Sequence, residues 1–314
     1  MEPDLKTIPW ARRLKLRHLE TFLVLESAGS ITAAAERMHM TQPAVSHWLA
    51  DIEDVIGSPL FVRGRKLKLT TAGDILRRHA ERMLGDVQRV DEELKAARSG
   101  LVGRLHVGCI HSAALAMVPR AIAALQERHP NTLIHIAEGT MVDLLARLGK
   151  REFDVVVGTI DVRAHQYGFA TQILRADVVR IVCRVDHPLA RKRKPTWAEA
   201  ASYPWVLPPP HSLSRMRVEE AFSEQGIPLP QPRVETVSVA AIQAHLHATD
   251  CVAPLSGQVA DFYTSLGLLA RVALTPVSRF ADLGTIWPED SANPLLAEFT
   301  AALKKQMKAS SASA

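Results

Sequence analysis

Apolar residues near the amino terminus recur at the spacing of helix faces. Within residues 16–56, three groups follow the i, i+3, i+4, i+7 pattern of a helix with one buried side. The groups are Leu16, Leu19, Phe22 and Leu23; Ile31, Ala34, Ala35 and Met38; and Val45, Trp48, Leu49 and Ile52, extended by Val55 and Ile56. Gly29 and Ser30 separate the first two groups, and about three residues, 39–41, separate the last two. A connection this short predicts a helix-turn-helix whose second helix begins at Gln42.

The second helix of this pair, TQPAVSHWLADIE in residues 41–53, has two different sides. Its apolar positions, Trp48 among them, are expected to face a protein core. At about 100° per residue, the opposite side holds Pro43, Ser46, His47 and Ala50. Thr41 is placed to cap the helix, and Pro43 loses nothing in a first turn that has no internal hydrogen bonds yet. The sequence therefore predicts an exposed amino-terminal turn suited to phosphates or base edges.

Residues 60–69, LFVRGRKLKL, are typical of two short strands around Gly64. The segment contains no acid and these cations: Arg63, Arg65, Lys66 and Lys68. A basic hairpin beside a helix-turn-helix predicts a wing that binds phosphates, each neutralised phosphate adding about −0.9 to the salt slope of binding. A hairpin that only faces solvent is the alternative, and the adjacent helix pair favours the wing.

A long helix is predicted over residues 71–97, with capping-box spacing between Thr71 and Asp74 and a length of roughly 40 Å. Its apolar residues alternate spacings of four and three on an otherwise charged rod: Leu76, Ala80, Met83, Val87, Val90, Leu94 and Ala97. One helix cannot bury such a seam alone. The seam packs either on the chain's own domains or on a second subunit, and the length and charge favour a dimer. A dimer would place two recognition helices on successive turns of one DNA face.

Residues 99–103 break the long helix and are expected to form a hinge, after which the pattern changes. Short β-rich runs then alternate with helical ones, the order of a largely parallel sheet. The expected strands are 105–110, 133–137, 153–157, 178–183, 205–207, 234–237 and 283–287, and the first expected helices are 112–128 and 140–151. Thr196 and Glu199 offer another capping box, and a last helix is expected to begin at Asn293 and Pro294.

Composition narrows the class of protein. The 314 residues are 47% hydrophobic and 23% charged, values typical of two or three globular domains, and the net charge of +5 permits an acidic partner. Three cysteines lie far apart without metal spacing, which fits a reducing cytoplasm. The amino terminus lacks a signal-peptide pattern, and no apolar run approaches the roughly 20 residues that span a bilayer. The final ASSASA is expected to be disordered.

Candidate ligand residues follow the expected strands, because ligands of open α/β sheets gather at the carboxyl ends of strands. These places are residues 109–112, 139–140, 208–214, 238 and 254–256. Ser112 and Thr140 are hydroxyls at helix starts, suited to a carboxylate or another anionic oxygen, and a plain helix cap is the alternative for each. Cys109 is interpreted as a core residue rather than a redox sensor.

Known catalytic and metal motifs are missing from the sequence. We find no phosphate loop, nucleophile elbow or HExxH, so no catalytic residue and no metal ligand is predicted. His245 and His247 point different ways on a helix, which disfavours a shared metal. Residues 191–194 are expected to be a solvated loop.

From Leu16 to about Met307 the sequence resembles LysR-type transcriptional regulators. The most specific block is LRHLETFLVLESAGSITAAAERMHMTQPAVSHWLADIEDVIGSPLFVRGRKLKLTTAGD. His47 and Trp48 depart from the basic-then-polar pair usual in the family. YPWVLPPP, GIPLPQPRVET and CVAPLS are similar to the branch that contains regulators of sugar uptake and of aromatic-acid catabolism, the galactose-binding-protein-regulator-like branch.

The resemblance implies a fold of class α/β with an amino-terminal all-α winged helix-turn-helix. The expected parts are the DNA-binding domain 1–70, a dimerising linker helix 71–98, an effector-binding domain 99–308 and a disordered tail 309–314. The effector domain resembles type 2 periplasmic-binding proteins, with subdomain I at about 104–161 and 268–308 and subdomain II at about 162–267. Crossover strands are expected near 158–163 and 266–270.

The implied function is a cytoplasmic regulator that binds double-stranded DNA and a small-molecule effector, without a cofactor. The effector is a sugar or an aromatic or other organic acid. Expected DNA contacts are Thr32, Thr41, Gln42, Pro43, Ser46, His47, Arg63, Arg65, Lys66 and Lys68. Expected effector contacts are Cys109, His111, Ser112, Thr140, Pro210, His211, Ser212, Pro254, Leu255 and Ser256.

Other partners are expected from the same resemblance: self-association to dimers and tetramers, RNA polymerase, and no membrane. Two alternatives come from other classes. An enzyme fused to a DNA-binding module would need a catalytic constellation, and a solute-binding protein would need export and has no use for the first 97 residues.

Overall fold

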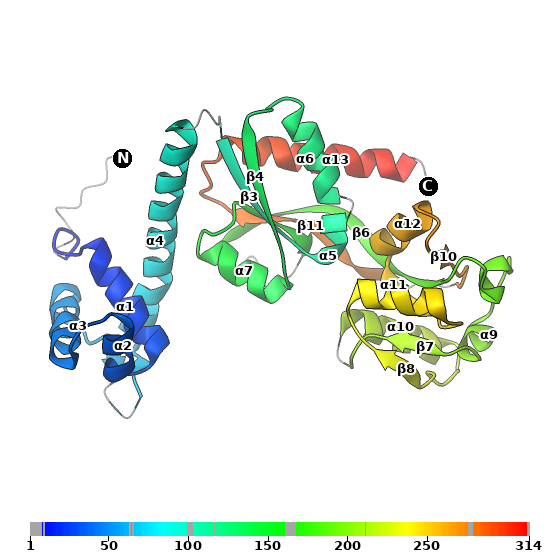
Figure 1. Cartoon of the computed structure of the whole chain (residues 1–314), viewed down its shortest axis with the longest axis horizontal. Helices are drawn as coiled ribbons and strands as arrows, with labels where there is room; N and C mark the ends of the chain where they lie inside the picture. The colour runs from blue at the N-terminus through cyan, green and yellow to red at the C-terminus, as the bar shows by residue number, and fades with distance from the viewer. Residues whose placement is uncertain are drawn as a thin grey trace. The chain divides into compact units, whose positions relative to one another are not determined.

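The structure is a computed structural model that describes residues 8, 10–62, 64, 66–98, 103–115, 117–160, 168–210, 212–275 and 279–312 (Figure 1). Side chains are described for all of these except 279–280 and 307–312. The chain forms two compact units. Unit 1 is Met1–Gly103 with Ala146–Phe153, and unit 2 is Arg104–Leu145 with Asp154–Ala314.

Unit 1 begins with three helices, α1 (Leu16–Ala28), α2 (Ile31–Arg37) and α3 (Gln42–Ile56), as the three apolar stripes predicted. Gly29 and Gly57 end α1 and α3 in the left-handed conformation, with φ of 68° and 78°, which a side chain rarely adopts. The buried cluster between the helices contains Leu19, Phe22, Leu25, Ala34, Ala35, Val45, Leu49, Ile52, Leu60, Phe61, Leu76 and Ala80.

A small hairpin follows α3. Strands β1 (Phe61–Val62) and β2 (Lys68–Leu69) pair antiparallel, with Phe61 opposite Leu69 and Val62 opposite Lys68. The two strands confirm the predicted hairpin, whereas Arg63 and Arg65 lie outside the described residues. Gly73, in the first turn of the next helix, lies so close to the Leu60 carbonyl that a Cβ would collide with it. This contact fixes the hairpin against the helix that follows.

The long helix α4 (Thr71–Arg98) matches the predicted length, but the structure divides its apolar seam. Leu76 and Ala80 are buried in the core of the three helices, while the next four seam residues are exposed. Farther along, the segment Ala146–Phe153 belongs to the same unit because it packs on α4. Gly85 approaches the Lys150 carbonyl, and Arg89 Nε donates a hydrogen bond to the Arg151 carbonyl at 2.6 Å. The expected hinge at 99–103 falls largely outside the described residues.

Unit 2 contains a sheet in the order β10-β6-β11-β5-β3-β4, with β9 also paired to β6. The strands are β3 (Gly103–Cys109), β4 (Thr132–Glu138), β5 (Val155–Thr159), β6 (Phe169–Cys183), β9 (Ala253–Ser256), β10 (Ala270–Arg271) and β11 (Arg279–Pro288). β3 and β5 are parallel, but β11 runs antiparallel to β5 and β6, and β9 and β10 run antiparallel to β6. The prediction of a largely parallel sheet was therefore wrong, because the chain returns along β6 rather than through another βαβ unit.

The strand β6 belongs to two layers. Its first part pairs with β11, and from Val179 it pairs with β9. We define the first subdomain as the part around β3, β4, β5 and β11, and the second as the part around β7 to β10. The chain passes between them within β6 and returns after β10. The first expected crossover, 158–163, begins with the last residues of β5, and its residues 161–163 lie outside the described residues. The second, 266–270, is the segment that leads into β10.

Helices cover both subdomains. In the first lie α5 (His111–Leu115), α6 (Met117–Gln126), α13 (Pro294–Ala312) and the beginning of α7 (Met141–Gly149), whose part from Ala146 belongs to unit 1. In the second lie a short 3-10 turn (Pro188–Arg191), α9 (Trp197–Ala201), α10 (Leu213–Glu224), α11 (Val239–Ala248) and α12 (Gly257–Ser265), together with the parallel strand pair β7 (Trp205–Leu207) and β8 (Pro232–Glu235). The capping box of Thr196 and Glu199 is present at α9.

Two predicted ends differ from the structure. The region expected as one helix over 112–128 contains α5 and α6, and α13 extends through Ala312 although 309–314 were expected to be disordered. No proline or glycine stops α13 in that stretch, and alanine favours helix. None of the helices that the structure describes combines the length and apolar character needed to cross a lipid bilayer.

Candidate functional site

The exposed side of α3 carries the side chains that the sequence singled out. Gln42, Pro43, Ser46 and His47 are all exposed, and the His47 side chain is 77% exposed with Nε2 3.7 Å from Asp51 Oδ2. Val45, Leu49 and Ile52 on the opposite side are buried. Gln42 Nε2 donates a hydrogen bond to Thr32 Oγ1 at 3.0 Å, which joins the starts of α2 and α3. The helix therefore presents a polar, uncharged first turn.

Two expectations about α3 were wrong in detail. Thr41 occupies the capping position but its side chain makes no capping hydrogen bond, since Pro43 removes one of the N–H groups that a cap normally meets. Trp48 is only half-buried. Its ring meets His18 edge-on at 5.6 Å between centroids, and the Arg17 guanidinium carbon lies 4.4 Å from the ring centroid. Trp48 thus joins α3 to the surface of α1 instead of entering the core.

The described part of the wing is basic and open. Lys66 and Lys68 are exposed, and no carboxylate among the described residues lies within ion-pair distance of either. Burial lowers the pKa of His18 in α1, helped by the charges of Lys15 and Arg17, so this histidine adds no positive charge at neutral pH. The available cations of the described wing are therefore Lys66 and Lys68.

The exposed part of the α4 seam forms an apolar stripe. Its residues follow spacings of four, three and four and are 46%, 43%, 56% and 54% exposed: Met83, Val87, Val90 and Leu94. Large apolar side chains in such a row on one helix usually mark an interface.

At the carboxyl ends of β3 and β4 the structure brings several predicted residues together. Gly139 N donates a hydrogen bond to the Cys109 carbonyl at 3.2 Å, and His111 Nδ1 lies 2.9 Å from Glu138 Oε1. Thr140 Oγ1 donates to Asp143 Oδ2 at 2.7 Å and accepts from Asp143 N at 3.3 Å. Thr140 therefore caps α7, and Glu138 and Asp143 are acidic neighbours that the sequence did not single out.

Cys109 belongs to the hydrophobic core of the first subdomain and is 0% exposed. Burial, with a smaller contribution from the charge of Glu138, raises the pKa of its thiol to about 11. A thiol that stays protonated reacts slowly with oxidants. The core interpretation of Cys109 is confirmed.

In the second subdomain, serines of the predicted loops make hydrogen bonds at the starts of helices. Ser212 Oγ accepts a hydrogen bond from Arg215 N at 3.3 Å and donates to the Pro209 carbonyl at 2.9 Å, and Ser238 Oγ accepts from Ala241 N at 3.3 Å. Leu255 is buried in β9, and Ser256 precedes α12 without making a capping bond. Pro210 is exposed next to His211, which lies outside the described residues.

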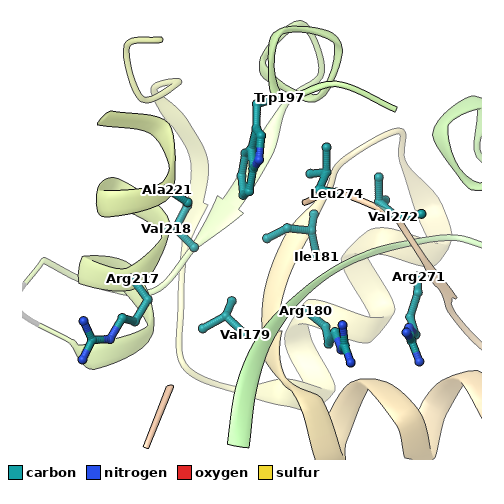
Figure 2. Close-up of a pocket in the computed structure, with 11 residues that line it drawn as sticks. Val179, Arg180, Ile181, Trp197, Arg217, Val218, Ala221, Arg271, Val272 and Leu274 are labelled. Atoms are coloured by element: carbon teal, nitrogen blue, oxygen red, sulfur yellow. The ribbon is translucent and has the colours of Figure 1, made fainter. Parts of the chain in front are cut away.

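A cavity of about 80 Å³ lies elsewhere in the second subdomain, among β6, α9, α10 and the segment after β10 (Figure 2). In Figure 2, Trp197, Ile181, Val218 and Leu274 surround its apolar centre, and the guanidinium groups of Arg180 and Arg217 lie outside that centre. None of the predicted effector residues lines this cavity. Within the part of the chain that the structure describes, no group of His, Cys, Asp and Glu side chains is arranged to hold a metal ion.

Comparison with known proteins identifies the family to which the chain belongs. Residues 16–74 match the bacterial regulatory helix-turn-helix proteins of the lysR family, and residues 98–308 match the LysR substrate binding domain. The chain belongs to the LysR family of transcriptional regulators. It therefore combines a DNA-binding domain with a domain that binds a small-molecule effector, and it is a regulator and not an enzyme.

Individual relatives agree with this assignment over most of their length. The chain is 31% identical over 280 residues to the HTH-type transcriptional regulator GbpR of Azospirillum brasilense, covering 88% of this chain and 82% of GbpR. It is 30% identical over 262 residues to PcaQ of Agrobacterium fabrum, covering 82% and 84%.

The fold is similar to that of solved LysR-type regulators. The crystal structure of CbnR matches with a TM-score of 0.62 at 20% identity, covering 94% of this chain and 99% of CbnR. CbnR complexed with its target DNA matches with a TM-score of 0.61, also at 20% identity, over 93% and 99% of the two chains.

Proposed function

We propose that this LysR-type regulator binds its operator by placing the first turn of α3 in the major groove. The observation that carries the proposal is the exposed polar row on α3, held by a buried apolar face and by the hydrogen bond from Gln42 to Thr32. Gln42 and Ser46 are the side chains for base edges, because amides and hydroxyls discriminate bases there. Thr32, Thr41, Pro43 and His47 flank them along the groove.

The wing is assigned to the phosphate backbone. Lys66 and Lys68 are exposed cations, and Arg63 and Arg65 of the same segment share the role on the strength of the sequence. Phosphate contacts set affinity and position rather than sequence preference.

The operator-bound form is a dimer that pairs the exposed stripe of α4, Met83, Val87, Val90 and Leu94, with its copy. Further assembly to a tetramer and contact with RNA polymerase belong to the same proposal. It places the protein in the cytoplasm, where a bacterial operator is accessible and where the three buried cysteines stay free.

The effector is proposed to bind between the two α/β subdomains. His111, Ser112 and Thr140 supply one side, and residues 210–212 with 254–256 supply the other. Cys109, expected from the sequence as a further contact, is 0% exposed in the core and is left out of the site. A ligand that prefers one arrangement of the subdomains biases DNA binding only by the difference between its affinities for the two arrangements.

Salt dependence tests the DNA interface. The variants Lys66→Ala and Lys68→Ala are each expected to weaken binding to all duplexes and to reduce the slope of log affinity against log salt by about 0.9, as one phosphate contact is lost. Fluorescence anisotropy of a labelled duplex at several salt concentrations measures the slope. Lys304→Ala, an exposed lysine on α13, is the matched control and should leave it unchanged. An unaltered slope in both wing variants contradicts the wing assignment.

A further inference from the structure

Polar groups without partners gather where α5 of the first subdomain meets α12 of the second. Leu115 of α5 packs against the apolar cluster that contains Val259 and Ala260 of α12. Ser112 lies three residues before Leu115 and hence on the same side of α5, toward α12. Ser112 is 9% exposed.

The α12 side of this junction has unsatisfied groups of its own. Gln258 is 6% exposed, and neither its Nε2 nor the Oγ of the preceding Ser256 has a hydrogen-bond partner among the described residues. Buried polar groups are almost always hydrogen-bonded in folded proteins, since leaving one unpaired is costly. Several unpaired groups at one junction therefore indicate a place built for another molecule's polar atoms.

A buried carboxylate completes the junction. Asp177 is 0% exposed on β6, at the point where the strand leaves β11 for β9. Val178 N donates a hydrogen bond to Oδ1 of this carboxylate at 2.9 Å, and the backbone N–H groups of Gly257 and Gln258 favour its charged form. Its second oxygen, Oδ2, has no partner in the described part of the chain. One face thus offers an acceptor beside the donors of Gln258 and the two serines.

The charges around the predicted effector residues disfavour an anion. Glu138 and Asp143 stand beside His111 and Thr140, and the Thr140 hydroxyl already donates to Asp143. In residues 109–115, 138–143 and 207–215 the only arginine or lysine is Arg215. Its guanidinium lies 2.7 Å from Glu219 and 3.7 Å from Glu235, so its charge is neutralised. Around these predicted residues a carboxylate ligand would meet carboxylates and no available cation. Of the arginines whose charges act on Asp177, Arg175 hydrogen-bonds to the Ala176 carbonyl and Arg180 lines the separate cavity.

We propose that the α5–α12 junction, formed by Ser112, Asp177, Ser256 and Gln258, recognises hydroxyl groups of an uncharged polyhydroxylated effector such as a sugar or cyclitol. A hydroxyl both donates and accepts, so one group satisfies the free oxygen of Asp177 and a neighbouring donor together. A deprotonated carboxylate cannot donate a hydrogen bond to the free oxygen of Asp177. This inference rests on the effector-binding function proposed above and names the chemical class of the effector.

Paired probes separate the two ligand classes. Isothermal titration of the full-length protein uses neutral hexoses, pentoses and inositols beside glucuronate, galacturonate and benzoate. We expect at least one neutral compound to bind about tenfold or more tightly than its matched uronate, because an unpaired buried group costs at least that factor. Tighter binding of any of the anions, or binding of no neutral compound, overturns the proposal.

Variants locate the binding at the junction. Gln258→Leu keeps Asp177 and its backbone contacts intact and should weaken binding of the neutral ligand about tenfold or more. Asp177→Asn should also weaken binding of the neutral ligand and should narrow the preference over the uronate, because the amide offers a hydrogen-bond donor to a carboxylate. Glu289→Gln, exposed in the turn after β11, is the matched control. Unchanged affinity in a folded Gln258→Leu protein refutes the site.

Operator binding is measured on the same preparations. If the protein binds DNA and responds to a uronate, the proposed regulatory function stands and the assignment of a neutral polyhydroxylated effector is wrong. A protein that binds no duplex contradicts the proposed function itself, whichever ligand it takes.

Discussion

His187 is a buried histidine whose two ring nitrogens are both in use. It is 0% exposed, Nδ1 accepts a hydrogen bond from Leu189 N at 3.1 Å, and Nε2 meets the Asp250 carbonyl at 3.2 Å. The Tyr203 ring lies 4.5 Å away between centroids. This arrangement needs a neutral ring with the proton on Nε2, because a protonated Nδ1 cannot accept the bond from Leu189. Burial accordingly lowers the pKa of His187 below its usual value.

A pH-dependent stability follows. Because the folded-state pKa of His187 is depressed, its contribution is complete above the unfolded value of about 6.5 and is lost as pH falls below it. Chemical denaturation of the effector domain in the full-length protein at pH 5 to 8 is expected to show a falling free energy of unfolding below about pH 6.5. In His187→Asn the protein should be less stable at pH 8 and the fall should be shallower. An equally steep fall in the variant contradicts this role, and His247→Asn, at an exposed position of α11, is the control.

The residues that sequence reasoning missed share a physical cause. Asp177, Glu138 and Asp143 are ordinary acids in the sequence, and only tertiary contacts place one under α12 and the others beside His111 and Thr140. Trp48 was misplaced for a similar reason, since helical periodicity cannot distinguish a core position from the edge that packs on α1. The positions of Gln42, Ser46 and His47 were predictable because a single amphipathic helix determines which side is exposed.

At the scale of elements, α4 combines two roles on one seam. Leu76 and Ala80 serve the core of unit 1, while Met83, Val87, Val90 and Leu94 extend beyond it. The sequence gives one continuous pattern and no sign of the division, because both roles demand the same spacing of apolar residues.

Replacing apolar residues of the exposed α4 stripe by aspartate tests whether this stripe forms the dimer interface. The double variant Val90→Asp and Leu94→Asp is expected to lower the dimer affinity by about a hundredfold or more, because burial of each Val or Leu contributes about 1.5–3 kcal/mol. Light scattering after size exclusion measures the mass across a concentration series. The thermal midpoint of the monomer should change little, since both side chains are exposed in the single chain. Glu93→Gln, a neighbouring exposed position, should remain dimeric. A double variant that stays dimeric at every concentration places the interface elsewhere.

At the scale of the whole molecule, the sequence predicted the two kinds of architecture but not their connections. The helix-turn-helix depends on contacts between neighbours in the chain, so periodicity and turn residues determine it. The sheet of unit 2 depends on pairings such as β11 with β5 and β6, whose residues lie more than a hundred positions apart. The residue pattern of a strand reports mainly which of its faces are buried, so the direction of each strand in such a sheet depends on the path of the chain.

The central claim is that this chain recognises particular DNA sequences through α3, and selection from genomic DNA tests it most directly. Purified protein is mixed with genomic fragments at moderate salt, and the bound fragments are sequenced. The predicted result is enrichment of fragments with two inverted half-sites about 10–10.5 base pairs apart or a multiple of that spacing. Gln42→Ala combined with Ser46→Ala should lose the enrichment while retaining weak, salt-sensitive binding. Bound fragments without a common sequence, or the same enrichment in the double variant, would contradict the claim.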